Sequence, residues 1–255
     1  MSILVDYTIH LADNALILGH RNSEWTGHGP ILEQDIALSN IALDLIGQAR
    51  YFYQYAATLL NTASPETKNF TEDDLAYLRN EREFKNCLLT EQENGDWGNT
   101  ILRQFFFSTY QYYLFNLLRN SADAHVAAIA EKALKEVTYH LRWSGEWVIR
   151  LGDGTVESHT RMLRAVEKLW PFTGELFMPA PYETELAAES IAVDPSTLKT
   201  AWIKKVQEVF EKATIPNPGE MFMHTGGKTG THTEKLGYLL AEMQVLQRSF
   251  PGATW

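Results

Sequence analysis

LDLIGQAR, residues 43–50, lies within a run in which apolar side chains recur every three or four positions. The members of this run are Leu38, Ile41, Leu45, Ala49, Phe52, Ala56 and Leu59. A second stretch, KEVTYHLRW (residues 135–143), belongs to a similar run made of Val126, Ala130, Ala133, Val137, Leu141, Val148 and Leu151. This spacing is that of one face of an α-helix. Both stretches are therefore predicted to be helical, with Leu45 and Val137 on the buried faces.

Helical spacing continues through most of the chain. Four long helices are predicted, at residues 3–22, 31–60, 99–118 and 123–151, and the last of them ends at the sequence Gly-Asp-Gly. Long antiparallel segments of this kind are typical of a helical bundle. The predicted fold class is therefore all-α, a long-helix bundle with additional short helices.

Shorter helices are predicted around this bundle. They lie at residues 71–91 (one or two helices, with Thr71 as N-cap), 158–177 (broken or distorted at Pro171) and 194–213, where Asp-Pro-Ser gives a good start. A last helix at residues 231–249 follows a Pro/Gly-rich loop, with Thr231 or Thr233 as its N-cap. No internal repeat or linker is found, so residues 1–255 are predicted to form a single domain.

The third long segment is dense in aromatic residues, which either fill the bundle core or form part of a partner surface. Phe105, Phe106 and Phe107 are consecutive and must cover three different faces of a helix. We therefore expect at least one of these rings to face away from the core.

Composition narrows the function classes. The chain has 255 residues, 45% of them hydrophobic, which is enough for a sizeable core. A net charge of −10 argues against nucleic-acid binding, because phosphate neutralisation needs clustered Lys and Arg. The single cysteine, Cys87, cannot form an internal disulfide, which fits a reducing compartment. Because no signal peptide or membrane-spanning run is recognised, a cytoplasmic protein without membrane or nucleic-acid partners is predicted.

Two other features are assigned to structure rather than chemistry. Cys87 in FKNCLL is predicted to be half-buried and not catalytic. GGKTG (residues 226–230) suggests a phosphate loop, but it lacks the full G-x-x-x-x-G-K-[ST] pattern and a preceding strand. A nucleotide site is therefore not predicted there.

The two opening stretches resemble the metal motifs of ferritin-like bundles. In those bundles two helices each carry Glu-x-x-His facing inward, and two others each carry a single Glu. Here the first stretch has Leu and Gln at the Glu and His positions, and the second has Val and His. Iron needs anionic oxygen ligands, which Leu and Val do not supply. The resemblance implies a ferritin-like fold with a degenerate di-iron site and no metal, whose vestigial positions are Asn14, Leu45, Gln48, Ser108, Val137 and His140.

Longer segments carry a second resemblance. They are LADNALILGHRNSEWTGHGPILEQDIALSNIALDLIGQAR (11–50), NEREFKN (80–86), KEVTYHLRWSGEW (135–147), IAVDPSTL (191–198) and GGKTGTHTEKLGYLLAEMQVLQRSFPGATW (226–255). These segments resemble the C subunits of the bacterial phenylacetyl-CoA epoxidases, which are the phenylacetate ring-hydroxylating monooxygenase complexes. The resemblance covers nearly the whole chain.

This resemblance implies a non-catalytic, structural subunit in aerobic phenylacetate catabolism, a pathway of aromatic compound degradation. The complex inserts one oxygen atom into the aromatic ring of phenylacetyl-CoA. Its di-iron cofactor belongs to a related catalytic A subunit, and electrons come from an iron–sulfur flavoprotein reductase. This chain would hold no cofactor and would brace the A subunit, with the other subunits and the reductase as indirect partners.

The resemblance also points to candidate substrate contacts. The residues are Glu83, Phe84, Lys85, Asn86, Thr184, Glu185 and Leu186. In that family these two segments look like candidates for contacting the acyl-CoA or for lining the subunit interface. Arg and Lys suit the phosphates of CoA. The alternative is a solvated helix face with local ion pairs such as Glu81 with Lys85.

Two interpretations remain open for the polar residues at the degenerate site. Gln48 and His140 are predicted to join a hydrogen-bond network, with Lys135 or Arg50 as further candidates, because unpaired buried polar groups are costly. The alternative is an active ferritin-like metalloenzyme or metal-binding protein with a non-standard ligand set. That set would be Asp44, Glu136 and His140.

Overall fold

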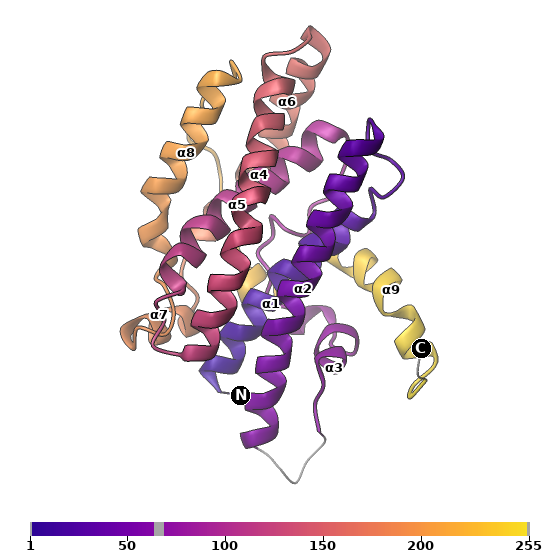
Figure 1. Ribbon diagram of the computed structural model, residues 1–255, viewed down its shortest axis with the longest axis vertical. Coiled ribbons are helices and arrows are strands. Elements are labelled where there is room, and N and C mark those ends of the chain that lie inside the picture. Colours follow the sequence, from indigo (N-terminus) through magenta and orange to yellow (C-terminus); the bar gives the residue numbers. More distant parts are fainter. Residues whose placement is uncertain (1, 64–68, 254–255) are drawn as a thin grey trace.

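The computed structural model describes residues 2–63 and 69–253, and within these ranges it has nine α-helices and no strand (Figure 1). The four long helices are α1 (Ile3–Ser23), α2 (Leu32–Ala63), α4 (Trp97–Leu118) and α5 (Ala124–Gly152). They pack as the pairs α1–α2 and α4–α5, with α2 also against α5. The predicted all-α, ferritin-like bundle is confirmed.

Close packing of α1 on α2 depends on a glycine. A Cβ at Gly19 would lie 3.1 Å from Ile46 Cγ1 and 3.3 Å from Leu45 Cβ. A larger side chain would therefore push the two helices apart. Leu45 lies at this crossing and is fully buried.

The shorter helices lie outside the bundle. α6 (Val156–Leu169) and α8 (Lys199–Lys212) pack against α4 and α5, whereas α9 (Glu234–Ser249) contacts α3 (Glu72–Tyr77). In Figure 1, α8 and α9 consequently stand at opposite edges of the molecule. α8 covers the aromatic side of α4, and α9 covers the segment that follows α3.

Several helices begin at residues whose side chains satisfy free backbone N–H groups. Asp96 accepts from the N–H of Asn99 at the start of α4, and Thr71 forms a capping box with Asp74, so Thr71 is confirmed as an N-cap. Thr233 occupies the N-cap position of α9, but its hydroxyl makes no capping bond. The predicted N-cap position of Thr233 is therefore confirmed, although its hydroxyl donates to a buried carboxylate described below.

Residues 71–91 are less helical than predicted. They contain α3 and one 3₁₀ turn, η1 (Glu81–Glu83), and the chain then runs without a helix to residue 96. The N–H groups of Lys85 and Cys87 donate to the Asp13 and Asn14 side chains of α1, both at 2.7–2.8 Å. Because buried side chains satisfy this backbone, a helix is not needed there.

The region around Pro171 breaks as predicted. α6 ends at Leu169, and two 3₁₀ turns follow, η2 (Trp170–Phe172) and η3 (Gly174–Phe177). A short helix, α7 (Pro181–Ala188), was not predicted, although Pro181 at its first position is a typical start signal. A 3₁₀ turn, η4 (Pro195–Leu198), also precedes α8.

The expectation of an outward-facing ring on α4 is wrong. Phe105, Phe106 and Phe107 are all buried. Phe106 lies on the side turned toward α8, where it contacts Trp202 and Trp170, with ring centroids 5.5 and 5.7 Å away. The three phenylalanines of α4 therefore belong to the core.

Buried apolar side chains from all nine helices join one cluster in the described part of the chain. The single-domain prediction also spans residues 1, 64–68 and 254–255, which lie outside the described residues, and it stays a prediction. Among the residues that the structure describes, no helix is long and apolar enough to cross a bilayer. The cytoplasmic location stays a prediction too.

Candidate functional site

Leu45 on α2 and Val137 on α5 are fully buried in the core. Their burial agrees with the stripes read from the sequence. Neither side chain carries an atom that can bind iron. The idea that they replace lost carboxylates stays a prediction, because burial alone also describes an ordinary core residue.

Four polar side chains form two pairs across the contact between α2 and α5, and we call them the polar seam. The Nε2–H of His140 donates to Asp44 Oδ2 at 2.9 Å, and Gln48 Nε2 donates to Glu136 Oε2 at 2.9 Å. Partners on each helix are four residues apart, so the pairs lie one turn from each other. The predicted hydrogen bonding of Gln48 and His140 is confirmed.

Neither of the two suggested cations joins the seam. Arg50 pairs with Glu72, with Nε and Oε1 3.3 Å apart, and Lys135 is exposed. Burial raises the pKa of the half-buried Glu136 carboxyl, and the nearby charge of Asp44 raises it further. The Nδ1 atom of His140 is buried without a hydrogen-bond partner.

The alternative metal set is not brought to one point by these contacts, because Glu136 is bonded to Gln48 whereas Asp44 is bonded to His140. In residues 2–63 and 69–253, no group of three or more His, Cys, Asp or Glu residues is arranged to hold a metal ion. The alternative stays a prediction that metal analysis must test.

The other two vestigial positions bond elsewhere. Asn14 Oδ1 accepts from the N–H of Cys87, and its Nδ2 donates to the carbonyl of His10. Ser108 accepts from Gln104 Nε2 at 2.7 Å. All six vestigial positions are buried, but the hydrogen bonds of Asn14 and Ser108 do not connect them to the polar seam.

The NEREFKN segment mixes buried and exposed residues. Phe84 and Asn86 are fully buried, and the exposed Glu83 accepts from the N–H of Asn80. Lys85 is half-buried, with its Nζ 3.4 Å from Asp6 and 5.5 Å from the centre of the Tyr182 ring. The predicted Glu81–Lys85 pair does not form, because Lys85 turns toward α1 and α7.

The second candidate segment lies on α7. Thr184 and Glu185 are exposed, whereas Leu186 is buried. Tyr182 and Lys85 bring α7 and the NEREFKN segment together. The structure thus places the two candidate segments side by side. Some of the candidate residues in them are exposed and others are buried.

A cluster of buried charged groups behind these segments was not predicted. Lys228 Nζ donates to Glu183 Oε2 at 2.9 Å, and both side chains are almost fully enclosed. Glu175 accepts from the backbone N–H groups of Leu88 and Gly226. Burial lowers the pKa of His10, whose Nδ1–H donates to a backbone carbonyl, and the ring is therefore neutral at pH 7.

The GGKTG sequence was the available signal for this cluster. Its lysine is Lys228, and a Cβ at Gly227 or Gly230 would lie 2.3 Å from the carbonyl oxygens of Asn86 and Arg82, respectively. The glycines are thus required because this loop lies directly against NEREFKN. Cys87 lies in the same region and is fully buried, not half-buried as predicted, and burial raises the pKa of its thiol well above the ordinary value.

Glu91 and His232 form a second buried pair. The Nδ1–H of His232 donates to Glu91 Oε2 at 2.8 Å, and Nε2–H donates to the Phe84 carbonyl at 2.9 Å. Glu91 also accepts from Asn86 Nδ2 and from the N–H and hydroxyl of Thr233. Burial opposes the charge on His232, but the bond to Glu91 and its charge outweigh burial, so the pKa of His232 lies above its ordinary value.

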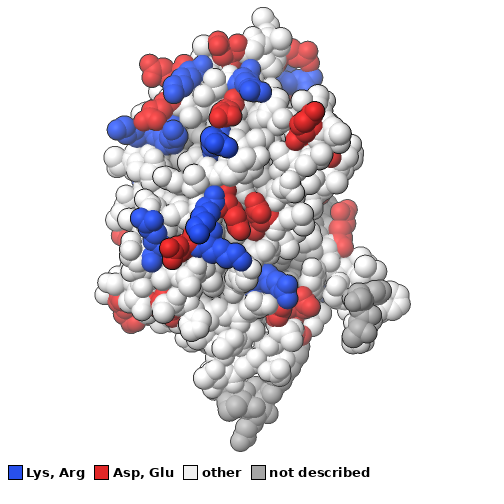
Figure 2. Space-filling view, in the orientation of Figure 1, with Lys and Arg blue, Asp and Glu red and all other residues white. Residues whose placement is uncertain are grey.

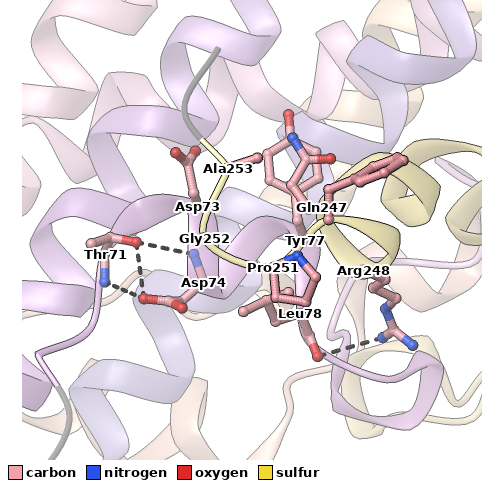
Figure 3. A pocket seen from close by; sticks show the side chains of 11 residues that line it. Thr71, Asp73, Asp74, Tyr77, Leu78, Gln247, Arg248, Pro251, Gly252 and Ala253 are labelled. Atoms are coloured by element: carbon pink, nitrogen blue, oxygen red, sulfur yellow. Dashed lines mark hydrogen bonds between the residues drawn. The ribbon is translucent and has the colours of Figure 1, made fainter.

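A cavity of about 680 Å³ lies between α3 and the residues that follow α9 (Figure 3). Its lining includes Asp73, Tyr77 and Arg248, and it includes none of the predicted site residues. Arg248 donates to the carbonyls of Leu78 and Arg79. This cation is thus already used to attach α9.

Comparison with known proteins agrees with the fold and with the motifs. A family model described as "Phenylacetic acid catabolic protein" matches residues 2–255. The C subunit of the 1,2-phenylacetyl-CoA epoxidase of Escherichia coli (strain K12) is 49% identical over 255 residues, which covers 100% of both chains. The chain therefore belongs to the phenylacetic acid catabolic protein family.

Proposed function

We propose that this chain is a non-catalytic, structural subunit of a phenylacetyl-CoA epoxidase, and that it braces a di-iron A subunit. The observation that carries the proposal is the full-length similarity to the C subunit of such an epoxidase, in a bundle whose central Leu45 and Val137 cannot bind iron. A core filled by apolar side chains and hydrogen-bonded pairs is stable without a metal. The chain would therefore act by contact with a partner that carries the metal.

An exposed apolar face on α2 supports this role. Leu32, Ile36 and Leu43 are 71%, 51% and 66% exposed. At 100° per residue they fall within about 40° of one another around the helix axis. Contiguous exposed apolar side chains are typical of protein–protein contact sites. The helix that turns Leu45 inward thus presents a surface that suits a helix of the A subunit.

A share in the CoA-substrate site is proposed for fewer residues than the sequence suggested. Phe84, Asn86 and Leu186 are buried, so they support the fold. The exposed Glu83, Thr184 and Glu185 and the half-buried Lys85 remain available to a ligand or a partner. Any contact of phenylacetyl-CoA with this chain would therefore use the outer face of α7 and the NEREFKN surface beside it.

The experiment is co-expression with the catalytic A subunit, followed by co-purification and an assay of phenylacetyl-CoA epoxidation. Leu43→Asp places a charge on the α2 face and is expected to reduce both complex formation and turnover at least tenfold. Val156→Asp is the matched control, because Val156 is 87% exposed at the start of α6, away from that face. Undiminished turnover by the A subunit alone would contradict the proposed function.

A further inference from the structure

One glycine of α2 is not required by any contact within the chain. A Cβ at Gly47 would meet no atom outside its own stretch of helix within 4 Å, whereas a Cβ at Gly19 would meet α2 at 3.1 Å. Of the glycines inside helices in the described part of the chain, Gly47 alone has this open space. Glycine is the least favourable residue in a helix interior apart from proline. Packing within this chain therefore does not explain Gly47.

Gly47 lies in the middle of the exposed apolar face of α2. It is half-buried, and Leu43 and Tyr51, one turn away on either side, are 66% and 40% exposed. At 100° per residue, each of them lies about 40° from Gly47 around the helix axis. Two large side chains thus flank a gap on the outer surface of α2. A second helix can come close at such a gap, because the distance between helix axes depends on the side chains at the contact.

Two carboxylates of the polar seam lie beside this gap. Asp44 is about 60° around α2 from Gly47. Its side chain is 37% exposed, and Glu136 on α5 is half-buried. Lys132, one turn before Glu136, donates to the hydroxyl of Tyr51 instead of to a carboxylate. In Figure 2, acidic side chains lie over the contact between α5 and α2, close to Lys and Arg side chains.

A partner that covers this surface must supply positive charge. Burial already raises the pKa of Glu136 and the charge of Asp44 raises it further, while the charges of His140 and Lys132 do not reverse the shift. Among the described residues, neither carboxylate forms an ion pair with a lysine or arginine. Removing their remaining water is costly unless a cation takes its place.

We propose that a helix of the A subunit crosses α2 at Gly47, between Leu43 and Tyr51, and places an arginine or lysine against Asp44 and Glu136. This inference rests on the proposed function, because it takes the A subunit as the partner. It adds the point at which the two subunits cross and the charge of the side chain that the partner contributes. Continuity with the exposed apolar face of α2 supports the same partner for both.

The test titrates the full-length chain with the A subunit to obtain the dissociation constant, and it records the melting temperature of the isolated chain. Gly47→Leu is expected to weaken association at least tenfold, because the new side chain fills the gap. The isolated variant is expected to melt about 2–4 °C higher, because leucine favours a helix interior over glycine. Weaker association of a more stable chain excludes misfolding as the cause.

Two further variants accompany this test. Ala241→Leu is the matched control, because Ala241 is exposed on α9, outside the surface formed by α2 and α5, and it should associate like the wild type. Asp44→Asn combined with Glu136→Gln removes both charges but keeps oxygens that accept the hydrogen bonds of the polar seam. This double variant is expected to keep the fold and to weaken association at least tenfold.

Leu43→Asp separates this inference from the proposed function. If Leu43→Asp weakens association and Gly47→Leu does not, the proposed function stands and the crossing at Gly47 is overturned. Wild-type affinity of the double carboxylate variant would overturn the basic side chain of the partner. If Leu43→Asp associates like the wild type, or if the wild-type chain forms no complex, the use of the α2 face and this inference are both overturned.

Discussion

The His232–Glu91 pair allows a pH-dependent prediction in which geometry fixes the sign. Both ring nitrogens of His232 face atoms that only accept, namely a Glu91 oxygen and the Phe84 carbonyl. Glu91 accepts hydrogen bonds from Asn86, Thr233 and His232. His232 must accordingly carry two protons and a positive charge, which agrees with its raised pKa. The pair joins the start of α9 to the segment after η1.

The magnitude follows from the partners that remain. Removing one member of a buried ion pair costs about 3–5 kcal/mol, because the other charge stays buried without its partner. Glu91 would keep three donors, from Asn86 and Thr233. We therefore expect His232→Gln to lower the free energy of unfolding by about 3 kcal/mol, the lower end of that range.

The pH dependence separates charge from simple packing. A histidine whose folded pKa is raised contributes stability in full below its unfolded pKa of about 6.5, and this stability is lost as pH rises through the folded value. The wild-type protein should thus approach His232→Gln in stability at alkaline pH. Urea unfolding of both proteins from about pH 6 to pH 10 measures the difference. A difference that is constant with pH would refute the argument that His232 is charged.

Three further outcomes are expected. Arg79 donates to Asp13 from two nitrogens in a buried pair, so Arg79→Met should lower the free energy of unfolding in urea by about 3–5 kcal/mol. The double variant with Asp13→Asn should lose less than the sum of the two single-variant losses, and additive losses would contradict the pairing. Leu45→Ala should cost about 2–5 kcal/mol in the same assay through the cavity it leaves, and a neutral effect would place Leu45 outside the core. Thr71→Ala should cost about 1 kcal/mol by removing the α3 cap, with faster amide exchange in α3 as a local check.

Apolar periodicity predicted α2 and α5 because each buries a continuous stripe, whereas α4 is buried over most of its surface and was predicted from its aromatic density. The same rule correctly placed Leu45 and Val137 inside. It failed on Phe106. This ring points away from the four long helices but is buried against α8, and residue spacing along one helix does not indicate that another helix covers its outer face. It also failed on residues 84–88, whose backbone is satisfied by side chains more than seventy residues away.

The candidate site, like the fold, was predicted only in part from the sequence. Gln48 and His140 could be assigned hydrogen bonds, because buried polar groups need partners, but their partners Glu136 and Asp44 lie on another helix. The buried Lys228–Glu183 pair had only the GGKTG glycines as a signal. Glycines in a loop indicate that another segment packs closely against it, but they do not indicate which segment that is.

The central claim is that this chain binds no iron itself and supports a partner subunit that binds iron. Elemental analysis of iron tests it most directly, on the chain purified alone and on the chain co-expressed with its A subunit. The account predicts no bound iron in the isolated chain, and iron together with phenylacetyl-CoA epoxidation only in the complex. Two tightly bound irons per isolated chain would contradict it and would assign chemistry to this subunit itself.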